Sequence, residues 1–278
     1  MIRLLSKEKR IDSLVLLRIF MMERFLERLS VSKYNDKLIL KGGLLVSSMI
    51  GSALRSTMDT DMTIRGVIVD IGTIRRMVES IISITLFDGI TFSIRAVTTI
   101  MEEAEYAGVR VSMIAFLDNI RVPLKSDFST GDEITPSPIK YQYELMFENR
   151  SINLLSYNLE TLLAEKLETV IARATTNTRM RDFYDIYILS VMFWKSINSN
   201  LLTEALHATS CQRGTLRMMT NAEKVLLDLQ KNKNIQKLWA KYREKFHYTT
   251  DISWEMILKS VRQLAIYAGL LVKKVDIF

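Results

Sequence analysis

Apolar residues recur at helical spacing near the start of the chain and again through its second half. Residues 6–29 carry apolar side chains three and four positions apart, which predicts one amphipathic helix with Ser6 at its N-cap. Beyond about residue 157 the same spacing continues to the C-terminus. Predicted helices in this part cover residues 159–175, 181–195, 199–209, 215–230, 234–245 and 253–272.

The segment between these helical parts alternates apolar and polar positions, which is the pattern of strands. Pro123 places the last predicted strand at an edge, because proline has no N–H to donate to a ladder. Residues 126–138 contain turn-forming residues and predict a loop. Predicted strands cover residues 38–40, 57–64, 92–96, 109–115 and 120–127, with helices over 44–50 and 72–87. We therefore expect an α+β protein with a domain over residues 1–150 and a helical domain over residues 151–278.

Composition and charge narrow the class of protein. Of 278 residues, 48% are hydrophobic and 25% are charged, as in an ordinary globular protein. No apolar run reaches about 18 residues, and charges flank the apolar residues at the start, so we expect a cytoplasmic protein with no membrane span and no signal peptide. The single cysteine and two distant histidines leave carboxylates as the ligands for any metal. The net charge of +7 fits a phosphate-rich partner such as a nucleoside triphosphate or RNA.

The first candidate chemistry is an acidic pair, Asp59 and Asp61, on the predicted strand 57–64. Residues at i and i+2 of a strand point to the same side, so both carboxylates can bind the same hard cation, as two-metal nucleotidyl transfer requires. Gly42 and Gly43 lie upstream, where bare backbone N–H groups can contact phosphates. The alternative is an exposed strand face with two solvated aspartates.

A third carboxylate is needed to complete such a site, and Asp127 is the candidate. It ends the strand 120–127, just before the loop. Asp132 and Glu133 lie close by in the sequence and are competitors. The alternative for Asp127 is a turn-forming aspartate with no ligand role.

The helical half contributes a lysine and a second acidic pair. Lys166 lies on or beside the apolar stripe of its predicted helix, so its ammonium needs an anion, either a triphosphate or a carboxylate, unless it extends to solvent. Asp182 and Asp185 lie on a helix that is apolar on every side, so they need cationic partners. Candidate partners are Lys166, Arg173 or Arg179. The alternative is an ion-pair network that only braces the helices.

In their order and spacing, these segments resemble the AbiEii-type toxins of bacterial abortive-infection and type IV toxin–antitoxin systems, which are related to the mycobacterial MenT toxins. Lys41-Gly42-Gly43 followed by Arg55-x-Thr57-x-Asp59-x-Asp61 is similar to the first motif of that family. Segments 127–136, 163–167 and 181–185 are similar to its later motifs. One departure is that Gly42-Gly43 stands where the family often has Gly-Ser closer to the aspartates.

The resemblance implies a polymerase-β-like nucleotidyltransferase core with a mixed sheet, followed by an α-helical domain. It implies a toxin active in antiviral defence that transfers nucleotides from a nucleoside triphosphate to RNA with Mg²⁺, the tRNA acceptor end being the expected acceptor. A cognate antitoxin encoded nearby is the expected partner. Alternatives are nucleotidylation of protein, including the chain itself, and an inactive module that binds only nucleotide or a partner.

The resemblance also assigns roles to residues. Thr57, Asp59, Lys166 and either Asp182 or Asp185 match the functional positions of the family. Together with the pattern analysis, this gives three expected groups. The catalytic group is Asp59, Asp61, Lys166, Asp182 and Asp185; the nucleotide-binding group is Gly42, Gly43, Thr57 and Lys166; and the metal ligands are Asp59, Asp61 and Asp127.

Overall fold

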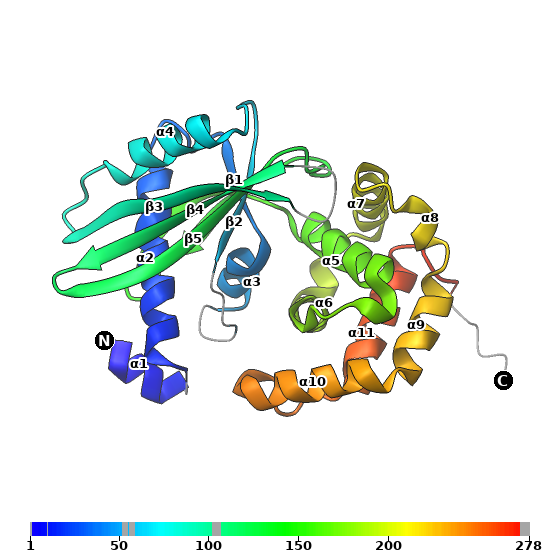
Figure 1. Cartoon of the computed structure of the whole chain (residues 1–278). Coiled ribbons are helices and arrows are strands. Elements are labelled where there is room, and N and C mark those ends of the chain that lie inside the picture. Colours follow the sequence, from blue (N-terminus) through cyan, green and yellow to red (C-terminus); the bar gives the residue numbers. More distant parts are fainter. Residues whose placement is uncertain (1, 10, 52–54, 56–58, 102–106, 273–278) are drawn as a thin grey trace. The chain divides into compact units, whose positions relative to one another are not determined.

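The computed structural model describes the whole chain except residues 1, 10, 52–54, 56–58, 102–106 and 273–278 (Figure 1). The chain forms two compact units. The first comprises Met1–Asp132 and Pro138–Tyr157, and the second comprises Glu133–Ser137 and Asn158–Phe278. The main boundary therefore lies between residues 157 and 158, and a short piece of the preceding loop belongs to the second unit.

The first unit contains a seven-stranded mixed sheet with the strand order β3-β4-β5-β2-β1-β7-β6. The pairs β1–β7 and β2–β5 are parallel, and the other neighbouring pairs are antiparallel. The strands are β1 (Leu38–Lys41), β2 (Thr60–Ile64), β3 (Ile90–Met101), β4 (Ala107–Leu117), β5 (Ile120–Ser129), β6 (Ile139–Glu144) and β7 (Ser151–Ser156). The expected α+β class is confirmed.

Helices of the first unit are α1 (Ile2–Lys9), α2 (Ser13–Ser30), α3 (Gly42–Ile50) and α4 (Ile71–Ile82). The single helix predicted over residues 6–29 is wrong, because α1 and α2 are separate helices. Asp12 caps α2 by accepting a hydrogen bond from the N–H of Leu14, whereas Ser6 lies inside α1. Aspartate is a preferred N-cap residue, so a new helix begins there.

Two predictions about the strands also need correction. β5 lies inside the sheet, not at an edge. Proline is tolerated there because β2 pairs only with Ser126–Ser129, so that among the described strands β4 is the one neighbour of β5 at Pro123. Strands β6 and β7 were not predicted. Of the six residues of β6 only Tyr143 is buried, so its sequence lacks a clear apolar alternation.

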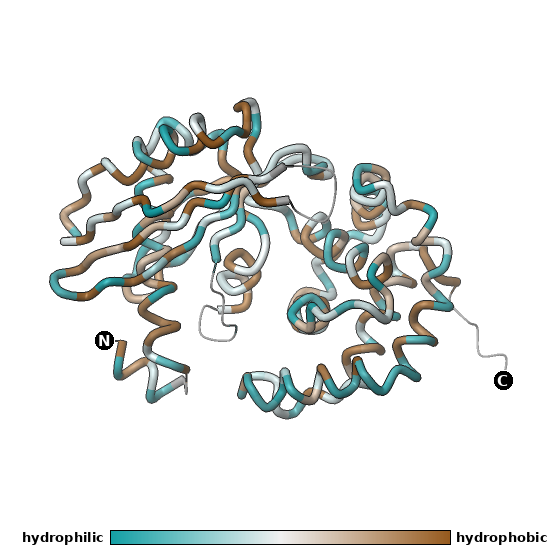
Figure 2. Tube along the Cα trace, in the orientation of Figure 1, coloured by the Kyte–Doolittle hydropathy of each residue, from teal (hydrophilic) through white to brown (hydrophobic). Residues whose placement is uncertain are grey.

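Hydrophobic segments recur along the strands and helices of the first unit (Figure 2). Part of its core lies on the face of the sheet opposite the charged side chains described below. Met62 on β2 and Phe128 on β5 are fully buried there. Helix α2 packs on β5, and Phe25 of α2 contacts Phe92 of β3 at 6.3 Å between ring centroids. Arg28 fixes the end of α2 by donating to both carboxylate oxygens of Asp88, at 2.8 and 2.9 Å.

In the part that the structure describes, the second unit is helical. Its α-helices are α5 (Leu159–Arg173), α6 (Met180–Phe193), α7 (Ser199–Gln212), α8 (Leu216–Met219), α9 (Ala222–Lys231), α10 (Lys233–Lys245) and α11 (Trp254–Tyr267). Short 3-10 turns follow α5, α6 and α10. The single helix predicted over residues 215–230 is two helices, α8 and α9. Among the described residues of the whole chain, no helix combines the length and apolarity that crossing a membrane requires.

Candidate active site

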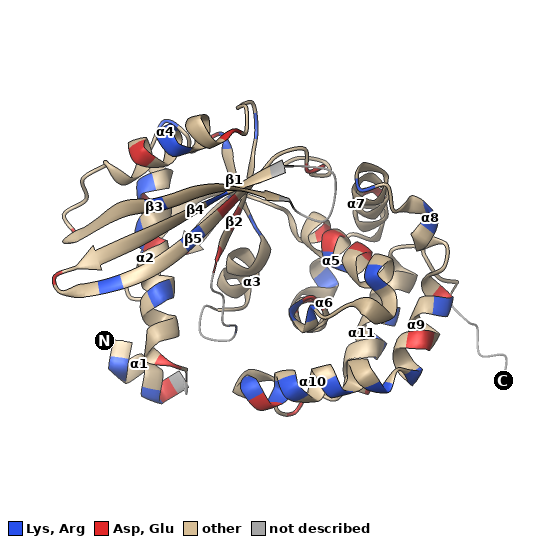
Figure 3. Ribbon diagram, viewed as in Figure 1, with Lys and Arg blue, Asp and Glu red and all other residues tan. Residues whose placement is uncertain are grey.

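Four charged residues on four adjacent strands form a row across the sheet of the first unit. Arg110 on β4 pairs with Asp127 on β5, Asp127 pairs with Asp61 on β2, and Asp61 pairs with Lys41 on β1. Side chains paired across neighbouring strands point to the same face, so the charges alternate as plus, minus, minus, plus. Figure 3 shows acidic and basic segments side by side where these strands meet. We call these four residues the charged row.

Asp61 is the centre of this row. Burial raises the pKa of its carboxyl, the positive charge of Lys41 opposes that shift, and the negative charges of Asp127 and Asp59 add to it. Asp127 and Asp59 therefore both lie within electrostatic reach of Asp61. A cation bound among them would relieve the repulsion.

The Gly-Gly turn is fitted closely around Asp61. Gly42 has φ +65°, and a Cβ at this position would lie 2.1 Å from Oδ2 of Asp61. The N–H of Gly43, at the start of α3, is directed to the same oxygen at 3.4 Å. The helix N-terminus and its dipole therefore favour a charged Asp61. In the structure this turn orients a carboxylate, and contact with phosphate stays a prediction.

Asp127 is held by Arg110. The Nε and Nη2 groups of Arg110 donate to Oδ1 and Oδ2 of Asp127 at 2.7 and 2.6 Å, a bidentate pair. The hydrogen bonds to Asp127 and the charges of Asp127, Asp59 and Asp61 raise the pKa of Arg110 against the opposing effect of burial. Arg110 therefore interacts electrostatically with all three predicted metal ligands and donates hydrogen bonds to one of them, Asp127.

The competitors of Asp127 have other surroundings. Asp132 accepts hydrogen bonds from Nζ of Lys41 at 2.7 Å, from Ser129 at 2.9 Å and from Thr63. Burial favours its neutral form, but Lys41 and these hydrogen bonds outweigh burial and lower the pKa of Asp132. Asp132 thus fixes Lys41 beside Asp61. Glu133 belongs to the second unit.

The donor chemistry of the site fits Mg²⁺, which takes oxygen ligands. Asp59 directly precedes β2, and Asp61 lies on that strand. Among the described residues, however, no three histidine, cysteine, aspartate or glutamate side chains are gathered into a ready metal-binding group. The ion pair of Asp127 with Arg110 is a physical reason why this carboxylate is not turned to its acidic neighbours. Thr57, a predicted nucleotide-binding residue, lies outside the described residues.

The second unit holds the other predicted group. Nζ of Lys166 on α5 lies 3.0 Å from Oδ1 of Asp182 and 2.6 Å from Oδ2 of Asp185, both on α6. All three side chains are buried. Nε of Arg179 lies 3.0 Å from the other oxygen of Asp182. The ion pairs predicted for Lys166 and Arg179 are present, so Lys166 meets carboxylates at its buried position.

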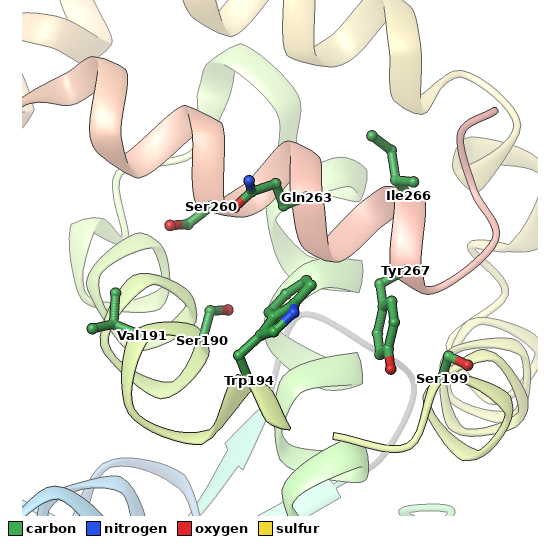
Figure 4. A pocket seen from close by; sticks show the side chains of 8 residues that line it. All are labelled: Ser190, Val191, Trp194, Ser199, Ser260, Gln263, Ile266 and Tyr267. Carbon is green, nitrogen blue, oxygen red and sulfur yellow. The ribbon is translucent and has the colours of Figure 1, made fainter. Parts of the chain in front are cut away.

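A pocket of about 900 Å³ lies elsewhere in the second unit (Figure 4). Its lining side chains are uncharged, and they come from α6, α7, α11 and the turn after α6. Trp194 and Tyr267 form one wall, with their ring centroids 5.0 Å apart. None of the predicted site residues that the structure describes lines this pocket. Its uncharged lining makes it unsuited to a triphosphate.

Sequence reasoning missed the two cations of the charged row as site residues. Arg110 is flanked by Val109 and Val111, which are buried on the opposite face. A lone arginine at an alternating position of a predicted strand was the available signal. Its link to Asp127 depends on the register of β4 and β5, which the sequence pattern does not specify.

Comparisons with known proteins bear on the family of the chain. The family model for the nucleotidyl transferase AbiEii toxin of type IV toxin–antitoxin systems matches residues 24–260. No curated protein matches the chain.

Among solved structures, a protein from H. pylori described as a nucleotidyltransferase aligns with a TM-score of 0.50 and 15% identity over 94% of this chain and 95% of its own. JHP933 from Helicobacter pylori aligns with a TM-score of 0.49 and 15% identity, over 92% of this chain and 90% of its own. An antigenic nucleotidyltransferase-like protein from Paracoccidioides brasiliensis aligns with a TM-score of 0.35 and 12% identity, over 84% of this chain and 91% of its own. At such identities the first likeness bears on the fold alone. Because the family model covers most of its length, the chain belongs to the AbiEii family of nucleotidyltransferase toxins of type IV toxin–antitoxin systems.

Proposed function

We propose that this nucleotidyltransferase toxin uses a nucleoside triphosphate and Mg²⁺ and transfers nucleotides to RNA, with the tRNA acceptor end as the acceptor. The observation that carries the proposal is the pairing of Asp61 with Asp127 on adjacent parallel strands, with Asp59 within electrostatic range of Asp61. We assign the sheet that carries them to a polymerase-β-like core. Membership of the family implies a cognate antitoxin as a partner.

In this proposal Asp59 and Asp61 hold Mg²⁺, and Asp127 joins them. When bound, the ion activates the attacking hydroxyl and stabilises charge on the triphosphate. The 3′-oxygen of the acceptor attacks the α-phosphorus, pyrophosphate leaves, and the hydroxyl proton passes to a carboxylate. The N-terminus of α3 and Lys41 contribute positive potential beside Asp61. Gly42, Gly43 and Thr57 are the proposed phosphate contacts.

Lys166 is proposed to neutralise the triphosphate. Its ammonium already has two carboxylates within 3.0 Å, so it is fixed in position and charged. Asp185 has no exposed surface, whereas Asp182 lies in the first turn of α6 and keeps a small exposed fraction. We assign Asp185 to holding Lys166 and Asp182 to positioning Lys166 or the attacking hydroxyl.

A stripe of lysines on α10 supports RNA as the acceptor. Lys233, Lys237, Lys241 and Lys245 are all exposed and recur every fourth residue, so they share one side of the helix. Figure 3 shows basic segments recurring along α10. Partly exposed aromatic rings, among them Tyr242 and Phe246 with centroids 4.6 Å apart, lie at its C-terminal end. Lysines that contact phosphates and rings that stack on bases together suit a single-stranded nucleic acid.

The experiment is incubation with each α-labelled nucleoside triphosphate and total RNA, followed by separation of RNA from protein. We expect labelled RNA with the wild type and a loss of at least about a hundredfold with Asp59→Ala or Asp61→Asn. Asp228→Asn is the matched control, because Asp228 is an exposed aspartate on α9. Equal labelling by the wild type and Asp59→Ala would contradict the proposal.

The location of the label decides between the alternatives. Label found on protein instead of RNA would replace RNA by protein as the acceptor. Nucleotide binding without any transfer, unchanged in Asp59→Ala, would indicate an inactive binding module. The charged row argues against an inactive binding module, because a site that only binds nucleotide does not require closely spaced carboxylates.

A further inference from the structure

Arg110 occupies a position that the proposed chemistry does not explain. Its guanidinium donates to both oxygens of Asp127, at 2.7 and 2.6 Å. The side chain of Asp127 is 12% exposed and that of Arg110 is 35% exposed, so Arg110 reaches the carboxylate from the solvent side. A guanidinium with this exposure can return to water at small cost. A buried ion pair would lack that freedom.

The charges of the four row residues cancel, but Asp132 beside Lys41 and Asp59 near Asp61 give the surroundings two further carboxylates. Arg110 and Lys41 supply two positive charges, and Asp127 and Asp61 supply two negative ones. The two cations differ in their attachment, because Lys41 is also held by Asp132, which is largely buried, whereas the bidentate bond of Arg110 is to Asp127. Of the two, Arg110 is the cation that can leave with less rearrangement.

We propose that Arg110 competes with the divalent cation for Asp127 and thereby sets the metal affinity of the site. When Arg110 stays on Asp127, the metal has Asp59 and Asp61 as its protein ligands. When Arg110 releases Asp127, the third carboxylate joins them, and the guanidinium is free to meet the negative charge of the triphosphate. This inference rests on the proposed function, because it concerns the same metal site.

The test measures Mn²⁺ binding without nucleotide, using the electron paramagnetic resonance signal of the free ion. Arg110→Gln should bind Mn²⁺ on the order of tenfold more tightly than the wild type, because it loses the competing charge. Lys125→Gln is the matched control. Lys125 is exposed, points to the same face of β5 as Asp127 and carries the same positive charge as Arg110. Its removal should therefore change the Mn²⁺ affinity far less than the removal of Arg110.

A double-mutant cycle shows whether Arg110 acts through Asp127. In the Asp127→Asn background, Arg110→Gln should bring no further gain in Mn²⁺ affinity. In wild-type protein, the Nε–H resonance of Arg110, assigned by its loss in Arg110→Gln, should shift on Mg²⁺ addition with the midpoint of metal binding.

Three results would overturn the inference: Arg110→Gln binding Mn²⁺ no more tightly than the wild type, a gain that persists in the Asp127→Asn background, or an Arg110 resonance that ignores Mg²⁺. If the wild type binds Mn²⁺ through Asp61 and one of these occurs, the proposed function stands and only the role of Arg110 fails. If neither the wild type nor Arg110→Gln binds Mn²⁺, the proposed metal site fails as well.

Discussion

Gly42 shows how a single residue shapes the environment of Asp61. Its positive φ and the 2.1 Å approach that a Cβ would make to the Asp61 carboxylate each require glycine. The two requirements can be separated with Gly66, which also has a positive φ, +69°. Among the described residues, nothing lies within 4 Å of the place that a Cβ of residue 66 would take. Comparison of the two glycines therefore isolates the contact with Asp61.

We predict that Gly42→Ala displaces Asp61 and lowers nucleotidyl transfer by at least about tenfold, because a small misplacement in an active site is costly. Gly66→Ala carries the same backbone strain, about 1 kcal/mol, without the contact, and should leave transfer unchanged. Transfer rates and urea unfolding of both variants provide the measurement. Equal transfer by the two variants would contradict a positioning role for Gly42.

At the residue scale, the sequence was informative where a pattern is local. The helical stripe placed Lys166 among apolar residues, which required an anionic partner, and the structure shows two carboxylates there. That Asp59 and Asp61 share one face stays a prediction, because Asp59 precedes β2. The partners of Asp127 and Asp132 could not be predicted. They depend on strand register and on a loop that returns Asp132 to Lys41, both of which are set by contacts distant in the sequence.

At the scale of elements, α5 and α6 are joined by Lys166 and its two carboxylates. We predict that Lys166→Met lowers the free energy of unfolding by about 3 kcal/mol or more, because two buried carboxylates lose the ammonium between them, while Arg179 stays beside Asp182. Combining it with Asp185→Asn should restore part of that loss by removing one uncompensated charge. Urea denaturation measures both, and no recovery in the double variant would argue against a shared ion-pair network.

Helix α2 is joined to the end of β6 by a buried glutamate. Glu23 is fully buried and accepts the N–H of Met146 at 3.1 and 3.2 Å. Burial, which outweighs that hydrogen bond and the charge of Arg24, raises the pKa of Glu23 to about 8 from 4.5. The folded protein therefore binds this proton more tightly than the unfolded chain. The contribution of the protonated Glu23 carboxyl to the free energy of unfolding is complete below pH 4.5 and is lost as the pH rises to about 8.

We predict that Glu23→Gln matches the wild type near pH 4.5 and becomes more stable above pH 8, by up to about 5 kcal/mol, since the pKa rises from 4.5 to about 8 and each unit of pKa shift is worth about 1.4 kcal/mol. Glu79→Gln, at an exposed glutamate of α4, should show no such divergence. Urea unfolding across this pH range measures the difference. A constant difference at every pH would mean that Glu23 is charged in the folded protein.

Most elements with strong periodicity were predicted, including α5, α6 and the strands of the charged row. The failures have local causes. Asp12 starts a new helix inside one continuous apolar pattern, and β6 carries too few buried side chains to alternate clearly. Strand β7 does alternate buried and exposed residues, but it is only six residues long and was not predicted. Pro123 lies in an interior strand at a point where, among the described residues, β4 is the neighbour that pairs with β5. Such pairings are tertiary and cannot be seen in a window of sequence.

At the scale of the whole molecule, charge is distributed unevenly in a way that bears on RNA. The lysine stripe of α10 contributes four positive charges on one exposed side, whereas the charged row is balanced. Binding of RNA through such a stripe releases counterions and should weaken as salt rises. The net charge of +7 alone could not locate this surface.

We predict that Lys237→Gln combined with Lys241→Gln weakens RNA binding and reduces the slope of log Kd against log salt by about 1.4, which is about 0.7 for each lost single-strand phosphate contact. The pair Lys33→Gln and Lys140→Gln removes the same charge from exposed positions of the first unit. Fluorescence anisotropy at several salt concentrations is the measurement. An identical slope change for both pairs would mean that the stripe is not the binding surface.

The measurement that tests the central claim most directly is anomalous diffraction from crystals grown with Mn²⁺ and a non-hydrolysable triphosphate. The account predicts an anomalous peak bonded at about 2.0–2.3 Å to carboxylate oxygens of Asp59 and Asp61, with the triphosphate on that ion. A triphosphate bound away from Asp61, with no Mn²⁺ on either aspartate, would contradict the account.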